Sequence, residues 1–260
     1  ADLRTAVDQK GLRVVYQPIV SVDTMKIASC EALCRWDHPE LGPISPATFI
    51  PLAEETGIIS EITTFMLDAA CAECTKWPSP LSVSVNLSAK DFRDASIIGK
   101  VEAALRNANL KPERLEIEVT ETSLLDDKSA ARQYVEELRQ LGVRIALDDF
   151  GTGYSSLSYL HRLHLRTVKI DRSLISQFGD HRAETICSHV VRLAHDLGLV
   201  AVAEGIETWR HAEIARAIGF DELQGYWFAR PAPVAEITGH LRGKGVFPLQ
   251  PVGKRLQHLR

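Results

Sequence analysis

The feature that most constrains this chain is a regular alternation of short apolar segments with longer amphipathic segments along its 260 residues. Apolar residues recur at three- and four-residue spacing, as in helices, in residues 58–77, 96–108, 128–141, 182–197 and 208–218. Gly142, Gly198 and Gly219 stand directly after three of these segments, and glycine there commonly ends a helix. Strands that alternate with helices indicate a mainly parallel sheet with helical crossovers.

The apolar segments predict about eight strands, at residues 14–17, 27–34, 81–86, 115–119, 144–147, 167–170 and 200–203 and near Leu223. Residues 21–26, between the first two strands, are too few for a helical crossover, so these two strands should be antiparallel. At this chain length, closure is favoured over an open sheet. We therefore predict an α/β fold, a TIM-like (β/α)8 barrel whose first hairpin supplies one antiparallel strand.

Polar side chains stand at or just beyond the end of nearly every predicted strand. In a parallel barrel these ends open on one face, so the side chains should meet at a single mouth. They are Glu31, Arg35, Asn86, Glu118, Glu121, Asp148, Asp149, Lys169, Asp171, Glu204, Glu207 and Gln224. Grouped carboxylates shift toward their neutral form unless a cation compensates them, and hard divalent ions with oxygen ligands do this well. The pattern predicts a divalent-metal site.

Each of these residues also has an ordinary structural interpretation. Asp148 and Asp149 could cap the next helix, and Asn86 could form a turn. Lys169 could pair with Asp171 at the surface. The joint occurrence of such residues at nearly every strand end favours a shared site.

The remaining motifs carry little chemistry. Cys71 and Cys74 form a C-x-x-C, but they lie in a helical segment and no second pair completes a zinc set, so we interpret them as small residues on one helix face. The five cysteines are an odd number, which indicates a reducing compartment. The glycine-bearing stretch after Asp149 matches no phosphate-binding fingerprint.

Composition limits the classes of partner. The formal net charge is -4, so no long-range attraction to duplex nucleic acid is expected, and a nucleotide ligand would need cations held locally. No apolar run is long enough to span a membrane, and the first ten residues do not form a signal peptide. We expect a cytoplasmic domain without membrane contact, at residues 1–242, cut from a longer or processed protein and followed by a basic tail at residues 243–260; anchoring of the parent protein stays open.

Several motifs, in order and with matching spacing, resemble the EAL domain family from about Asp2 to about Leu241. Glu31-Ala32-Leu33 followed by Cys34-Arg35-Trp36 resembles the signature that gives the family its name. The other matches are Tyr16-Gln17-Pro18-Ile19, Val85-Asn86-Leu87-Ser88, Glu118-Val119-Thr120-Glu121, Asp148-Asp149-Phe150-Gly151-Thr152-Gly153, Lys169-Ile170-Asp171, Ala203-Glu204-Gly205-Ile206-Glu207 and Gln224-Gly225-Tyr226. Cys34 departs from the leucine that is common there.

The resemblance implies a metal-dependent phosphodiesterase that hydrolyses the bacterial second messenger cyclic di-GMP to linear pGpG with one or two Mg²⁺ or Mn²⁺ ions. It implies a first metal site at Glu31, Asn86, Glu118 and Asp148. It implies a second site at Asp148 and Asp149, with Asp171 and Glu204 nearby. Lys169 would position or activate the attacking water, with Glu31 and Glu204 as its catalytic neighbours.

The resemblance also assigns substrate contacts. Arg35 and Gln17 would face the phosphate and base of the ligand, and Glu207 and Gln224 would complete the polar shell. Glu121 would anchor the glycine-bearing loop. Family members often dimerise and are often fused to sensor or cyclase domains, which implies a homodimer and a longer parent protein.

Two other functions stay open on the sequence. One is a non-catalytic cyclic di-GMP receptor that keeps the pocket, which the retention of every acidic position disfavours. The other is an unrelated barrel enzyme, such as a lyase that uses Lys169 to form a Schiff base.

Overall fold

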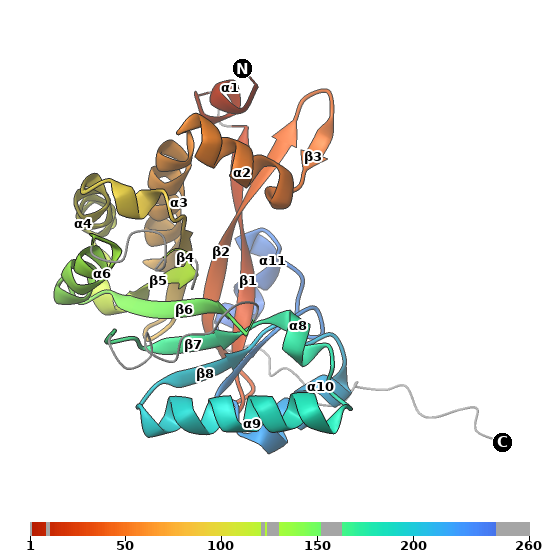
Figure 1. The fold of residues 1–260 in the computed structure, drawn as a ribbon. Coiled ribbons are helices and arrows are strands. Elements are labelled where there is room, and N and C mark those ends of the chain that lie inside the picture. The colour runs from red at the N-terminus through yellow and green to blue at the C-terminus, as the bar shows by residue number, and fades with distance from the viewer. Residues whose placement is uncertain (1, 9–10, 121–122, 124–129, 152–162, 243–260) are drawn as a thin grey trace.

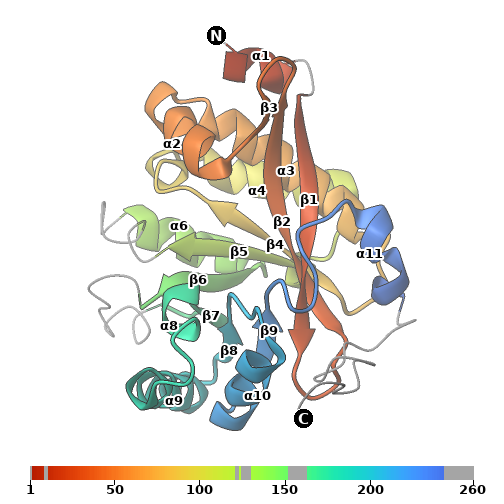
Figure 2. The same cartoon turned by 90° about the vertical axis from the view of Figure 1, so that its right-hand side faces the viewer.

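In the computed structural model the strands close into a barrel (Figures 1 and 2). The structure describes residues 2–8, 11–120, 123, 130–151 and 163–242. The nine strands of these residues run in the order β1-β9-β8-β7-β6-β5-β4-β2-β3, and β1 also pairs with β2. That pairing closes a ring of eight strands and leaves β3 outside. The strands are β1 (Leu12–Ser21), β2 (Ile27–His38), β3 (Gly42–Ile44), β4 (Ser82–Leu87), β5 (Leu115–Thr120), β6 (Arg144–Phe150), β7 (Thr167–Ile170), β8 (Val200–Ala203) and β9 (Glu222–Gln224).

One strand of the ring runs against the others. β1 is antiparallel to both β2 and β9, whereas the pairs from β2 through β4 to β9 are parallel. The turn between β1 and β2 is closed by a hydrogen bond from the Ser21 amide to the Lys26 carbonyl at 2.9 Å. The predicted TIM-like barrel with one antiparallel strand in its first hairpin is confirmed.

Helices α3, α4, α6, α9 and α10 lie outside the strands (Figures 1 and 2). Their bounds are α3 (Ile59–Cys74), α4 (Ser96–Ala108), α6 (Ala130–Gln140), α9 (His181–Asp196) and α10 (Trp209–Ile218). These are the five predicted helices. Four further helices, α1 (Asp2–Asp8), α2 (Pro46–Thr56), α8 (Arg172–Ile175) and α11 (Val234–Leu241), and strand β3 were not predicted.

Helix α4 shows why the sequence pattern succeeds locally. Its buried residues are Ile97, Val101, Ala104 and Leu105, which lie on one face at helical spacing. At its start the Asp94 carboxylate accepts a hydrogen bond from the Ser96 amide at 2.9 Å. The local signals and the packing therefore agree on the same element.

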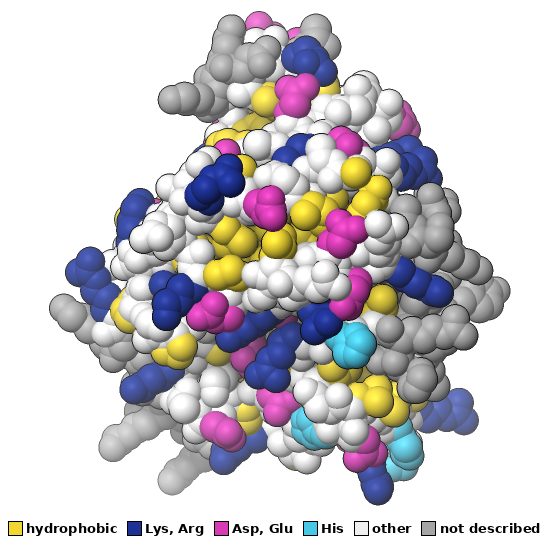
Figure 3. Space-filling model, turned by 90° about the vertical axis from the view of Figure 1, so that its left-hand side faces the viewer, with side chains coloured by type: hydrophobic (Ala, Val, Ile, Leu, Met, Phe, Trp, Pro, Cys, Tyr) yellow, Lys and Arg dark blue, Asp and Glu magenta, His cyan; other side chains and the backbone are white. Residues whose placement is uncertain are grey.

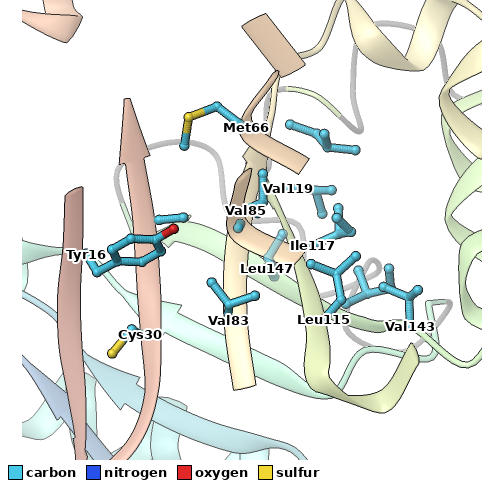
Figure 4. Packing of buried hydrophobic residues seen from close by; sticks show 14 of the residues in the cluster. Tyr16, Cys30, Met66, Val83, Val85, Leu115, Ile117, Val119, Val143 and Leu147 are labelled. Carbon is cyan, nitrogen blue, oxygen red and sulfur yellow. The ribbon is translucent and has the colours of Figure 1, made fainter. Parts of the chain in front are cut away.

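The apolar core lies between the strands and the helices rather than inside the barrel. Figure 4 shows apolar side chains of neighbouring strands gathered on one side of the sheet, namely Val83, Val85, Leu115, Ile117, Val119 and Leu147. Because side chains alternate across a strand, the residues between them point to the other side, into the barrel. On β5 these are Glu116 and Glu118, so the alternation places carboxylates within the ring.

Figure 3 shows the face of the molecule on which α4 and α6 lie. Lys and Arg side chains lie there among Asp and Glu side chains, with hydrophobic atoms between them. Among the described residues of this face the two signs of charge are interspersed, whereas a duplex-binding surface gathers Lys and Arg in one patch. Among the helices of the described residues, none combines the length and apolar character that crossing a membrane requires.

The two cysteines of the C-x-x-C are structural. Cys71 and Cys74 are fully buried on α3, and both thiols are free. Burial raises the pKa of Cys74 to about 11 and that of Cys71 to about 12. The interpretation of the pair as small core residues is confirmed.

Gly225 provides a test of how the barrel is closed near its mouth. A Cβ at this position would lie 2.1 Å from the Ile206 carbonyl oxygen, so the two backbone segments touch. We expect Gly225→Ala to lower the free energy of unfolding by about 1–3 kcal/mol, because the segments must separate. Urea denaturation followed by circular dichroism measures this.

Gly99 is the matched control for that variant. It is exposed within α4, and an added Cβ would meet no atom within 4 Å. Gly99→Ala should raise stability by about 0.5–1 kcal/mol, since alanine favours a helix over glycine. Equal stability of Gly225→Ala and the unaltered protein would contradict the close backbone contact.

Candidate metal centre

Lys169 on β7 lies at the centre of the polar side chains inside the barrel mouth. Its Nζ atom lies 2.6 Å from Glu204 Oε1, 2.8 Å from Glu118 Oε2 and 3.6 Å from both Glu31 Oε2 and Asp148 Oδ1. Those four acids come from β2, β5, β6 and the end of β8. The structure thus brings together residues that are up to 173 positions apart, from Glu31 to Glu204. Convergence at one mouth was predicted and is observed.

Glu31 is held by two amides as well as by the lysine. Asn86 Nδ2 donates to Glu31 Oε1 at 2.7 Å, and Gln224 Nε2 donates to Glu31 Oε2 at 2.6 Å. Burial works against ionisation of Glu31, but Lys169 and these hydrogen bonds outweigh it and lower its pKa. Glu31 is therefore a fixed carboxylate inside the barrel.

Three further carboxylates form a group that could hold a metal ion. One oxygen of each of Asp148, Asp149 and Glu204 lies within 4.8 Å of the others. The pairing of β6 with β7 shifts register between Leu147 and Phe150, and Asp149 has a left-handed φ of 57°. Non-glycine residues seldom adopt this conformation, and it lets two successive aspartates turn toward the same group.

Three acids of this centre have raised pKa values, which indicates that they lack enough neighbouring positive charge. Burial, with Asp148 and Asp171 nearby, raises the pKa of Asp149 to about 6. Burial raises the pKa of Glu204 to about 8 and that of Glu118 well above its usual range, even though Lys169 opposes both shifts. One lysine does not compensate this many acids. Oxygen donors at this density fit a hard divalent ion, so Asp148, Asp149 and Glu204 could bind a metal.

The protonation state of Lys169 bears on the Schiff-base alternative. Burial alone would lower the pKa of the amine, but Asp148, Glu118, Glu204 and Glu31 raise it well above its usual range. Only 1 % of the residue is exposed. A buried ammonium among carboxylates is not a nucleophile, which argues against a lyase. The suggested surface pair with Asp171 is wrong, because Lys169 is buried.

Asp171 has a structural contact of its own. Its carboxylate accepts a hydrogen bond from the Ser173 amide at 2.8 Å and caps the start of α8. It lies outside the group of three carboxylates, so its predicted role as a metal neighbour stays a prediction. Glu121, the predicted anchor of the glycine-bearing loop, lies outside the described residues.

A cavity of about 220 Å³ is lined by Asp148 and Glu204, two of the three carboxylates that could hold a metal ion. Its lining includes three of the predicted substrate contacts, Gln17, Glu207 and Gln224. Gln17 accepts a hydrogen bond from Gln224 and donates one to the Ala229 carbonyl. The other lining residues are Glu31, Leu33, Asp148, Arg172, Glu204, Gly205, Gly225 and Tyr226. Arg172 and Tyr226 were not predicted as site residues. Tyr226 belongs to the motif Gln224-Gly225-Tyr226, but its position in that motif does not by itself indicate a role in the site.

A second cavity, of about 310 Å³, adjoins the first through Leu33. It lies between β2 and helices α2 and α3, and its walls are mostly apolar, including Cys34, Ile50 and Met66. Arg35 and Asn86 are among the polar residues in its lining. Arg35 was predicted to face the ligand, and the structure places it here.

The family model described as EAL domain matches residues 1–231. The chain belongs to the EAL domain family. This agrees with the resemblance seen in the motifs and with the barrel.

Individual relatives support the assignment. The bifunctional diguanylate cyclase/cyclic di-GMP phosphodiesterase MucR of Pseudomonas aeruginosa is 40% identical over 241 residues, 91% of this EAL chain and 35% of MucR. The cyclic di-GMP phosphodiesterase NbdA of the same organism is 38% identical over 246 residues, 93% of this chain and 31% of NbdA. The chain spans roughly a third of these relatives.

Solved structures agree as well. A MucR phosphodiesterase in complex with c-di-GMP superposes with a TM-score of 0.86 at 40% identity and covers 91% of this chain and 98% of its own. The EAL enzyme Bd1971, in a form bound to cAMP and cyclic di-GMP, gives a TM-score of 0.87 at 28% identity, over 92% of this chain and 67% of its own.

Metal binding should release protons. At pH 7 and without metal, Glu204 with a pKa of about 8 is mostly protonated and Asp149 with a pKa of about 6 is partly so. A divalent ion binds the carboxylate form, so affinity should rise as the pH rises from about 6 to about 9 and then level off above the pKa of Glu204. Titration calorimetry with MnCl₂ at pH 7 in two buffers of different ionisation enthalpy measures the released protons. Identical apparent enthalpies would contradict the assignment.

Lys169→Met tests whether the lysine compensates the negative charge of the buried acids. Without metal the substitution removes the cation shared by four buried acids, so the free energy of unfolding should fall by about 3–5 kcal/mol. Saturating MnCl₂ should recover more of the Tm in this variant than in the unaltered protein. Lys76→Met is the control, because this exposed lysine forms only a surface pair with Glu73. An equal Tm loss with and without metal would count against a shared role for lysine and ion.

Proposed function

We propose that this EAL domain hydrolyses cyclic di-GMP to linear pGpG with Mg²⁺ or Mn²⁺. The observation that carries the proposal is the convergence of four acids around Lys169, at a cavity that three of them line: Glu31, Asp148 and Glu204 line it, and Glu118 is the fourth acid. The named activities of MucR and NbdA support it. We also propose that the domain forms a homodimer and that it acts within a longer protein that contains a sensor or cyclase domain.

The chemistry is attack of a water oxygen on one bridging phosphorus, with cleavage of the bond to the ribose 3′ oxygen. The products are one free 3′-hydroxyl and one 5′-phosphate. Divalent ions, when bound, lower the pKa of the water and neutralise charge on the phosphate oxygens.

The residues of the chain supply position and charge. Glu31, Asn86, Glu118 and Asp148 would hold the first ion, and Asp148, Asp149 and Glu204 the second. Lys169 remains an ammonium, so it donates hydrogen bonds and adds positive charge beside the reacting phosphate. Because Glu118 and Glu204 each contact Nζ, the lysine is held in place before substrate binds.

The two cavities suit the two halves of the ligand. A purine base has apolar faces and a polar edge, which matches the second cavity with its mostly apolar walls and the polar group of Arg35 in its lining. Gln17 and Gln224 border the first cavity next to the metal group. In this proposal a dinucleotide extends across both cavities, with a phosphate at the carboxylates that line the first cavity.

Glu31→Ala is the direct test. Loss of this ligand should reduce turnover of cyclic di-GMP more than about a hundredfold, measured by chromatography of the nucleotides after incubation with MgCl₂ or MnCl₂. Glu213→Ala, which removes an exposed carboxylate on α10, should keep full activity.

Two outcomes would overturn the proposal. A fully active Glu31→Ala variant that still binds metal would contradict the ligand assignment. Intact cyclic di-GMP after incubation with the unaltered protein, together with measurable binding, would instead identify a receptor.

A further inference from the structure

Tyr226 is an exposed aromatic residue at the edge of the catalytic cavity. Six large hydrophobic side chains of the described residues are strongly exposed, and Tyr226, at 48 %, is the one among them that lines this cavity. The Arg230 guanidinium lies 4.3 Å from the centroid of its ring. A guanidinium at this distance attracts the ring face and restrains its orientation.

The backbone beneath Tyr226 is fixed to the segment that carries Glu207. The Ile206 amide donates to the Gln224 carbonyl at 3.0 Å, and the Trp227 amide donates to the Ile206 carbonyl at 2.9 Å. These two bonds enclose Gly225, where any side chain would collide with Ile206. Tyr226 and Glu207 are therefore presented by two segments locked to each other.

Glu207 and Arg172 supply polar groups beside the aromatic ring. Arg172 Nη2 lies 3.0 Å from Glu207 Oε1, and both side chains are exposed and line the same cavity as Tyr226. A carboxylate can accept hydrogen bonds from ring and amino N–H groups, and a guanidinium can donate to O6 and N7 of guanine. The aromatic ring can contact the face of a guanine base while these two polar groups contact its edge.

We propose that Tyr226, oriented by Arg230, is the stacking surface for the guanine base that lies on the Glu207 side of the catalytic cavity. The inference rests on the proposed function and adds a binding residue and a positioning residue to it. Stacking acts on the base and not on the reacting phosphate, so it should contribute equally to binding of substrate and of transition state.

The kinetic test separates binding from chemistry. Tyr226→Ala should raise KM for cyclic di-GMP, and the Kd measured with a slowly hydrolysed phosphorothioate analogue, about tenfold, as expected for loss of one base–aromatic stack. The kcat should change less than about twofold, because the substitution weakens binding of the substrate and of the transition state equally. Tyr226→Phe should restore the affinity to within about twofold, since it keeps the ring face.

Arg230 is tested through Tyr226. Arg230→Ala should raise KM less than Tyr226→Ala does, and should add nothing in a Tyr226→Ala background, because it acts through the ring. Trp209→Ala is the control, since this exposed aromatic lies outside the cavity lining. Unaltered thermal melting would show that each variant is folded.

The outcomes separate this inference from the proposed function. An unchanged KM and Kd in Tyr226→Ala, or a loss confined to kcat, would overturn the stacking role while hydrolysis by the unaltered protein stands. Additive effects of the two substitutions would overturn the positioning role of Arg230. If the unaltered protein binds cyclic di-GMP without hydrolysing it, the proposed function fails and the Kd series still decides on Tyr226; absence of both binding and hydrolysis would overturn both.

Discussion

The structure depends on the contact of one buried ammonium with several buried carboxylates. Burying a charge is costly unless it is paired, and Lys169 pairs with Glu118 and Glu204 directly and with Glu31 and Asp148 at slightly longer range. The positive charge permits so many acids to lie inside one barrel. It does not fully compensate them, as the raised pKa values of Glu118 and Glu204 show. A bound divalent ion would supply the missing positive charge and displace protons from these acids.

The barrel supports this polar centre because its apolar core lies elsewhere. The apolar side chains of β4, β5 and β6 face the helices, so the helices provide the hydrophobic stabilisation of the fold. The inward positions are then free to carry charge near the strand ends. At the metal centre the backbone adopts the left-handed conformation at Asp149, where the shifted register of β6 and β7 turns two consecutive aspartates toward Glu204.

Some elements could not be predicted from local pattern. Helix α2 contains Pro46 and Pro51, and proline inside a segment ordinarily argues against a helix. Pro46 occupies the first helical turn, where its missing N–H is not needed. Strand β3 pairs with the last residues of β2 outside the ring, and with three residues it is too short to show a periodic pattern. Both elements form because tertiary contacts with β2 decide them.

The sequence by itself determined the alternation of strands and helices, the antiparallel first hairpin and the acids at the strand ends, because these depend on local spacing. Its ordered motifs also indicated the family. Only the tertiary structure decided that Lys169 is buried among four acids, that Asp171 caps a helix, and that Tyr226 and Arg172 line the cavity. The physical reason is that contacts between side chains depend on how distant strands close into a ring, and no local pattern records those distances.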